Sequence, residues 1–124
     1  MEEVDWVKAR EACSTAEMFE KLKREVEKDV DERNKQLPAP ADYAFKVVDK
    51  GDSLTVLREA QQASTSVVFS LDGRHIVVKQ RDRVLFSATV TLNDEGECRF
   101  KINGEEKQSW HLRKLALEDI FFLP

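Results

Sequence analysis

Zinc binding would need side chains from four residues that are scattered along this 124-residue chain, namely Cys13, His75, Cys98 and His111. Zinc sites usually draw their ligands in pairs that lie a few residues apart, and these four residues do not. A lone histidine is most often solvated or hydrogen-bonded, and we interpret His75 and His111 in that way. The spacing therefore predicts no bound metal.

The sequence also lacks the motifs of nucleophilic catalysis, of nucleotide binding and of calcium binding. A catalytic serine or cysteine needs a base within hydrogen-bond reach, and the sequence contains no nucleophile elbow and no cysteine in a recognisable motif. The four glycines form no phosphate-cradling run. The acidic turn 94–97 lacks the spacing of a calcium loop, and the adjacent Glu105 and Glu106 would point to opposite faces of a strand. We predict that the protein is not an enzyme and binds no cofactor.

The two cysteines bear on the cellular compartment. One lies in a predicted helix and the other on the inner face of a predicted strand. Small secreted domains are usually stabilised by several disulfides, which two cysteines cannot form. We therefore expect Cys13 and Cys98 to be reduced, buried thiols. Residues 1–6 are acidic and contain no apolar run typical of a secretory signal, and no segment is long enough to span a bilayer. These features predict a cytoplasmic protein without membrane contact.

The net charge argues against nucleic acid and anionic membranes as partners, and the composition indicates a folded domain. The chain has 20 Lys and Arg against 24 Asp and Glu, a net charge of −4, which is the wrong sign for general attraction to nucleic acid or anionic membranes. Its 41% hydrophobic content lies well away from that of disordered chains. The length fits one hydrophobic core, so we expect a single domain over residues 1–124.

The N-terminal part of the chain reads as helical. Ser14 and Glu17 have the spacing of a capping box, which predicts a helix start, and an apolar stripe follows at helical spacing, made of Met18, Phe19, Leu22, Val26 and Val30. Residues 3–13 are expected to be helical too, with a break at Ser14. Residues 1–36 are thus assigned to helix, and the prolines in the connector 37–42 end it.

Beyond the connector, apolar residues alternate with a period of two, which predicts six strands in residues 43–104. The turns between the strands set the pairing register and so show whether the strands share one buried face. A slip of one residue would move all apolar side chains of a strand to the opposite face. Taken as two-residue turns, Lys50-Gly51 aligns Val47 with Leu54, and Asp72-Gly73 aligns Phe69 with Ile76.

Two longer connections pass the same test. The loop 94–96, with glycine last, brings Val90 to Phe100, and the loop 81–83 aligns Val78 with Phe86. The connection 60–64 sets no register and is expected to be an exposed loop. All four hairpins keep apolar residues on one face, which favours an antiparallel meander over a parallel sheet.

A second helix closes the chain. Ser109 offers an N-cap ahead of Trp110, and the helix is expected over residues 109–123. The segments together predict an α+β fold: an N-terminal helix, an antiparallel meander of about six strands and a C-terminal helix, with both helices on one face of a twisted sheet. In the expected core, the helix contributes Phe19, Leu22 and Val26. They pack against four phenylalanines on one face of the sheet: Phe45, Phe69, Phe86 and Phe100.

Two surfaces are candidates for binding. Strand parity places Lys79, Arg99 and Lys101 on the outer sheet face as a weak patch for an anionic partner, although a solvated charged face that discourages edge aggregation is the simpler interpretation. The C-terminal helix carries apolar residues around most of its circumference, more than one sheet can cover. The interface predicted there comprises Trp110, Leu115, Leu117, Phe121 and Phe122.

These observations leave two hypotheses for function, and no motif identifies a family. The favoured one is a small non-enzymatic interaction or adaptor domain that self-associates, or binds a protein partner, through its C-terminal helix. Its simpler alternative is that the N-terminal helix, with Trp6 and Val7, covers the second apolar side within the monomer. The other function is a small-ligand-binding domain with a pocket between sheet and helices, which would show convergent polar groups in a cavity.

Overall fold

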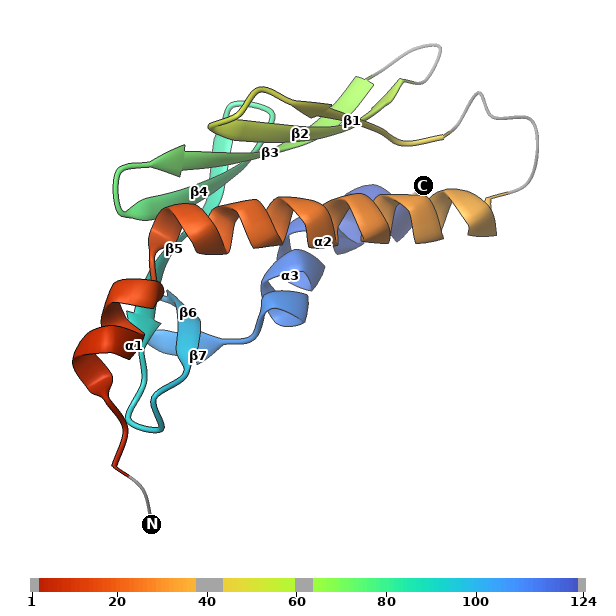
Figure 1. Cartoon of the computed structure of the whole chain (residues 1–124). Helices are drawn as coiled ribbons and strands as arrows, with labels where there is room; N and C mark the ends of the chain where they lie inside the picture. The colour runs from red at the N-terminus through yellow and green to blue at the C-terminus, as the bar shows by residue number, and fades with distance from the viewer. Residues whose placement is uncertain (1–2, 38–43, 60–63, 123–124) are drawn as a thin grey trace.

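The computed structural model describes residues 3–37, 44–59 and 64–122 (Figure 1). The fold is α+β, as the sequence predicts, with helices before and after one antiparallel sheet. The expected connector at 37–42 and the expected loop at 60–64 lie outside the described residues, except for Leu37 and Ser64. The elements are α1 (Trp6–Ala12), α2 (Thr15–Gln36), β1 (Lys46–Asp49), β2 (Ser53–Glu59), β3 (Ser64–Asp72), β4 (His75–Gln80), β5 (Arg83–Leu92), β6 (Cys98–Ile102), β7 (Glu105–Lys107) and α3 (Ser109–Phe122).

The first two helices begin where side chains can cap their free amides. Ser14 Oγ accepts a hydrogen bond from the Glu17 amide at 3.0 Å, and Asp5 Oδ1 accepts one from the Lys8 amide at 3.3 Å. The predicted break at Ser14 is therefore confirmed. The apolar stripe of α2 is confirmed as well, because Met18 is partly buried and the other members are fully so: Phe19, Leu22, Val26 and Val30.

The sheet is a meander of seven strands in which each strand pairs with the next. Strand β7 was not predicted, because it is only three residues long and polar. The turn before it consists of Asn103 and Gly104, whose φ angles are 53° and 80°. Two positive φ angles are what a type I′ hairpin turn requires. This turn signal could have revealed the seventh strand.

Two of the predicted hairpin registers are confirmed. Val90 pairs with Phe100, and the turn between them is closed by the Asn93 amide, which donates to the Glu97 carbonyl at 2.8 Å. Val78 pairs with Phe86, and a bulge next to this pair shifts the register towards the turn. Bulges increase the local twist of a sheet, and Figure 1 shows the sheet curling around α2.

The other two registers were wrong by two residues. Val47 pairs with Val56 and not with Leu54, and Phe69 pairs with Val78 and not with Ile76. In both turns glycine is the first central residue instead of the second, with φ angles of 88° at Gly51 and 60° at Gly73, which glycine adopts without strain. Because the shift is even, every apolar residue stays on the predicted face.

Both α2 and α3 cover the inner face of this curled sheet, whereas α1 lies at its far end against β5 (Figure 1). Phe69, Phe100 and Phe19 are at most 2% exposed, and Phe45 packs edge-on against Phe121 with ring centroids 4.9 Å apart. Phe86 belongs to the same core but is only partly buried. The expected core is therefore formed, with Phe86 at its margin.

A buried lysine ties α2 to the first hairpin. Lys23 is 4% exposed, and its Nζ donates to the Gly51 carbonyl at 2.8 Å and to Asp49 Oδ1 at 3.1 Å. Burial lowers the pKa of Lys23, but its contacts with Glu20 and Asp49 outweigh burial and raise it. The pKa of Asp49 is lowered, mainly by the hydrogen bond from the Gly51 amide and then by Lys23.

We predict that Asp49→Asn destabilises the protein near neutral pH and flattens its loss of stability in acid. A carboxyl group whose pKa is lowered on folding stabilises the native state above its usual pKa of 3.8, and this contribution is lost as the pH falls through the folded pKa. Urea unfolding at about pH 7 and about pH 3 measures both effects. Asp52→Asn in the same turn is the control, and identical pH profiles for Asp49→Asn and wild type would refute the prediction.

Candidate interface on the C-terminal helix

Helix α3 is apolar on both its inner and its outer sides. The inner side faces the sheet and is buried: Leu112, Ala116, Leu117, Ile120 and Phe121. On the outer side Trp110 is 56% exposed, Leu115 47% and Phe122 60%. Of the five predicted interface residues, three are thus exposed, whereas Leu117 and Phe121 belong mainly to the domain's own core.

The start of α3 differs in detail from the prediction. The Gln108 carbonyl accepts the hydrogen bonds from the His111 and Leu112 amides, at 3.1 and 3.2 Å, so Gln108 precedes the first turn. Ser109 is the first helical residue, and its hydroxyl donates to Glu25 on α2 at 3.0 Å. The assignment of Ser109 as the cap was therefore wrong, and its side chain links the two helices.

An arginine fixes α3 against α2. The Arg113 guanidinium donates to both carboxylate oxygens of Asp29, at 2.7 and 2.6 Å, and reaches Glu25 at 3.4 Å. Its side chain is only 16% exposed. Both hydrogen bonds to Asp29 come from Nη1, and the contact with Glu25 comes from Nη2. Short, charge-assisted hydrogen bonds in a partly buried site hold their partners in one geometry better than an exposed ion pair does. The outer side of α3 is therefore presented on a rigid helix pair.

A second arginine positions the exposed ring of Phe122. Arg33 Nε donates to the Phe121 carbonyl at 2.9 Å, and the guanidinium carbon lies 4.3 Å from the centroid of the Phe122 ring. At the other end of the helix, the Trp110 ring stacks on His111 with centroids 5.2 Å apart and planes inclined by 15°. Each aromatic ring is thus supported by its own chain while most of it stays exposed.

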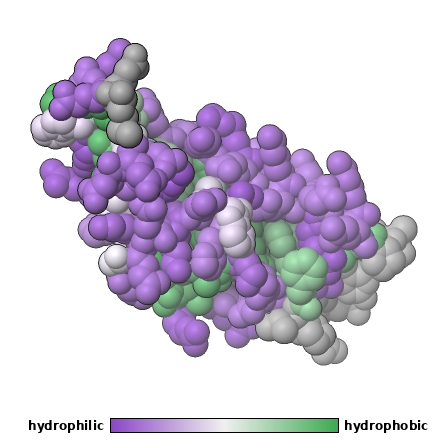
Figure 2. Space-filling model, turned by 90° about the horizontal axis from the view of Figure 1, so that it is seen from below, coloured by the Kyte–Doolittle hydropathy of each residue, from purple (hydrophilic) through white to green (hydrophobic). Residues whose placement is uncertain are grey.

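A groove of about 280 Å³ runs between α2 and α3 beside these rings. Leu117 and Phe121 contribute to its lining together with Trp110 and Phe122, and Glu32 and Gln36 belong to the opposite wall on α2. Figure 2 views the molecule from the side of the helices, where hydrophobic side chains interrupt a largely hydrophilic surface. Structure and sequence therefore agree that α3 has apolar surface beyond what the sheet covers.

The N-terminal helix does not cover this surface. Trp6 is 65% exposed and Val7 60%, and α1 lies against β5, away from α3 (Figure 1). The intramolecular alternative, in which these two residues bury the second side of α3, is therefore wrong. Helix α2 borders the groove without filling it.

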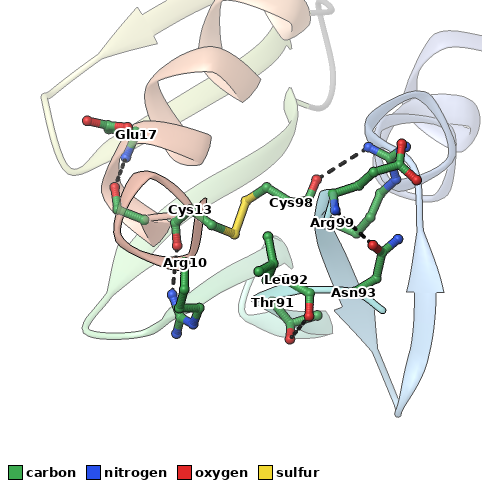
Figure 3. The surroundings of a disulfide bond; sticks show 10 residues. Arg10, Cys13, Glu17, Thr91, Leu92, Asn93, Cys98 and Arg99 are labelled. Carbon is green, nitrogen blue, oxygen red and sulfur yellow. Dashed lines mark hydrogen bonds and ion pairs between the residues drawn. A yellow bond between two sulfur atoms is a disulfide. The ribbon is translucent and has the colours of Figure 1, made fainter. Parts of the chain in front are cut away.

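The predicted cysteine state was wrong, because Cys13 and Cys98 form a disulfide (Figure 3). Cys13 follows α1 and is 2% exposed, and its Cα atom lies 5.4 Å from that of Cys98 at the start of β6. The Cys13 carbonyl also accepts a hydrogen bond from Arg10 at 2.9 Å. The two cysteines are 85 residues apart in sequence, so no local pattern could have predicted that the fold brings them together.

The two histidines lie on different elements, β4 and α3. His75 is exposed on the outer sheet face, with Nδ1 3.5 Å from Ser87 Oγ, which is at the limit of a hydrogen bond. His111 lies on α3. In the described part of the chain, no three side chains of the kind that bind metals converge.

The weak basic patch is not compact. Lys79 pairs with Val84 and Arg99 with Thr91, so they lie seven residues apart along β5, or about 20 Å. Arg99 forms an ion pair with Glu97, and Lys101 is exposed opposite Thr89. In the same turn, a hydrogen bond with Glu97 raises the pKa of Glu95. The sheet face therefore mixes both charges.

Comparison with protein-family models, curated proteins and solved structures gives no match. In residues 3–37, 44–59 and 64–122, no helix is long and apolar enough to cross a membrane. The functional argument therefore starts from the surface of α3.

Proposed function

We propose that this chain is a small, non-enzymatic interaction domain that self-associates through the outer side of α3. The observation that supports this proposal is the exposure of Trp110, Leu115 and Phe122 on one rigid helix whose other side is already buried. Trp110 and Phe122 also line the groove between α2 and α3, and large exposed apolar side chains beside a groove are typical of protein interaction sites.

The size of the patch sets the expected affinity. A buried aromatic side chain removes about 150–250 Å² from water, so three side chains that are about half exposed offer on the order of 300 Å². That area lies at the lower end of the range for the largest patch on a typical monomer, about 300–600 Å², and is small for a permanent interface. We therefore propose a weak, reversible dimer that forms at micromolar or higher concentration.

Ligand binding between sheet and helices is the less favoured function. The side chains that would line such a pocket are packed against each other, and Val56, Phe69 and Leu112 are 0% exposed. The groove between α2 and α3 does contain polar groups, but Arg113 and Asp29 already bind each other there. A ligand site would need polar groups that are free to converge on a ligand.

The proposal is tested by replacing the exposed apolar residues with aspartate. We expect Leu115→Asp and Phe122→Asp to be monomeric in sedimentation velocity at a concentration where the wild-type protein dimerises, because a desolvated charge opposes association. Their circular dichroism should match that of wild type, since both side chains are exposed. Val84→Asp, a similar change at a 51% exposed residue of β5, should leave the dimer intact.

Three outcomes would refute the self-association. They are a wild-type protein that is strictly monomeric, variants that dimerise as wild type does, and a loss of the fold in both variants without any change in mass. The last outcome would mean that Leu115 and Phe122 serve the monomer alone.

The cellular compartment stays a prediction, and so does the absence of nucleic-acid and membrane partners, which rests on the net charge of −4. The expectation of reduced cysteines was one of the grounds for the predicted cytoplasmic location. Disulfides persist mainly in oxidising compartments, so the Cys13–Cys98 bond weighs against the cytoplasm. Counting free thiols in protein isolated from each compartment decides the question.

A further inference from the structure

The exposed side of α3 carries a ridge with a symmetric order of side chains. Trp110, Lys114, Glu118 and Phe122 follow one another at intervals of four residues, which places them in one row along the helix. All four are about half exposed, and Lys114 Nζ lies 3.0 Å from Glu118 Oε2. The order is apolar, cation, anion, apolar, over about 18 Å.

We infer, building on the proposed self-association, that two copies of this chain pair through antiparallel α3 helices about a two-fold axis at the level of Ala116. Reversing the row exchanges its two charges and keeps its two apolar ends. Trp110 then meets the Phe122 ring of the second copy, and Lys114 meets its Glu118. A two-fold axis repeats each contact, which gives two aromatic pairs and two ion pairs.

Charge selects this orientation over the parallel one. Parallel helices would bring Lys114 against Lys114 and Glu118 against Glu118 across the axis, and facing like charges cost free energy. In the antiparallel pair the four charges alternate. Rows of residues spaced by four also pack well against each other, at a crossing angle of about −50°.

The aromatic ends of the ridge are prepared for this contact. Arg33 covers one face of Phe122, and His111 stacks against one face of Trp110. The remaining exposed parts of the two rings can therefore meet rings of a second copy without a large loss of side-chain freedom. The groove beside them, with Leu117 in its lining, offers room for the incoming ring.

Two charge-reversal variants test the orientation. Lys114→Glu gives a copy with two anions in the ridge, and Glu118→Lys gives a copy with two cations. In an antiparallel dimer each variant alone has like charges facing across the axis, so we expect its dimer dissociation constant to rise roughly 10-fold. An equal mixture of the two variants restores attraction at both positions and should dimerise about as well as wild type.

The mixture separates pairing between copies from effects within one helix, because each chain in it keeps its own like-charge pair. Lys28→Glu, which changes an exposed lysine of α2, is the control for net charge. If wild type dimerises but the single variants associate equally well, the antiparallel pairing is wrong while the proposed function stands. If wild type is monomeric throughout, both are wrong.

Discussion

Reduction of the Cys13–Cys98 disulfide is expected to lower the free energy of unfolding by about 4–5 kcal/mol. The bond closes a loop spanning 85 residues, and chain-entropy models give long loops the largest stabilisation because the crosslink restricts the unfolded chain most. The effect should also be local, since α1 has no buried residue and ends at Cys13.

Urea unfolding with and without a reductant measures the effect. Cys13→Ala/Cys98→Ala is the matched control: it should unfold as reduced wild type does and should not respond to the reductant. Amide hydrogen exchange should show that residues 6–12 lose protection first. Equal unfolding curves for oxidised and reduced wild type would contradict the predicted contribution.

Phe69→Ala is expected to destabilise the protein by about 3–5 kcal/mol, the usual cost of truncating a fully buried phenylalanine. Phe69 is 0% exposed and lies in β3 between Leu54 and Val78 of the neighbouring strands, so little around it can collapse into the cavity. Phe86→Ala should cost less, about 1–3 kcal/mol, because Phe86 is only partly buried.

The pair of variants provides its own control, because the same atoms are removed from two depths of one core. Chemical denaturation of both at one pH gives the comparison. A Phe86→Ala variant that is as destabilised as Phe69→Ala would show that the margin of the core is packed more tightly in solution than its exposure indicates.

The architecture could be predicted because strand parity tolerates small errors in the turns. Placing glycine at the wrong turn position shifted two hairpins, at Gly51 and at Gly73, by two residues. An even shift keeps the apolar face inward, so the fold class, the meander and the covered face were all correct. The short strand β7 was not predicted because its side chains are charged and show no apolar alternation.

Contacts between distant parts of the chain could not be predicted in the same way. The Cys13–Cys98 bond and the Arg113–Asp29 pair join residues more than 80 positions apart, and no periodicity encodes such pairs. The contacts that bury Lys23 are of the same kind, since its partners Asp49 and Gly51 belong to a hairpin that lies 26 and 28 positions further along the chain.

The candidate interface could be predicted only in part. Apolar residues are spread around most of the helical wheel of α3, so one sheet could not cover all of them. Their distribution does not say which side of the helix faces the sheet. The structure assigns Leu117 and Phe121 to the core and leaves Trp110, Leu115 and Phe122 outside. Contacts of α3 with β3 and α2 set that rotation of the helix.

Sedimentation equilibrium of the unmodified, oxidised protein tests self-association through α3 most directly. Over a series from micromolar to submillimolar concentration, the average mass is expected to rise from that of one 14.3 kDa chain towards twice this value, reversibly on dilution, and Phe122→Asp should abolish the rise. An average mass that stays at 14.3 kDa over the whole series would contradict the account.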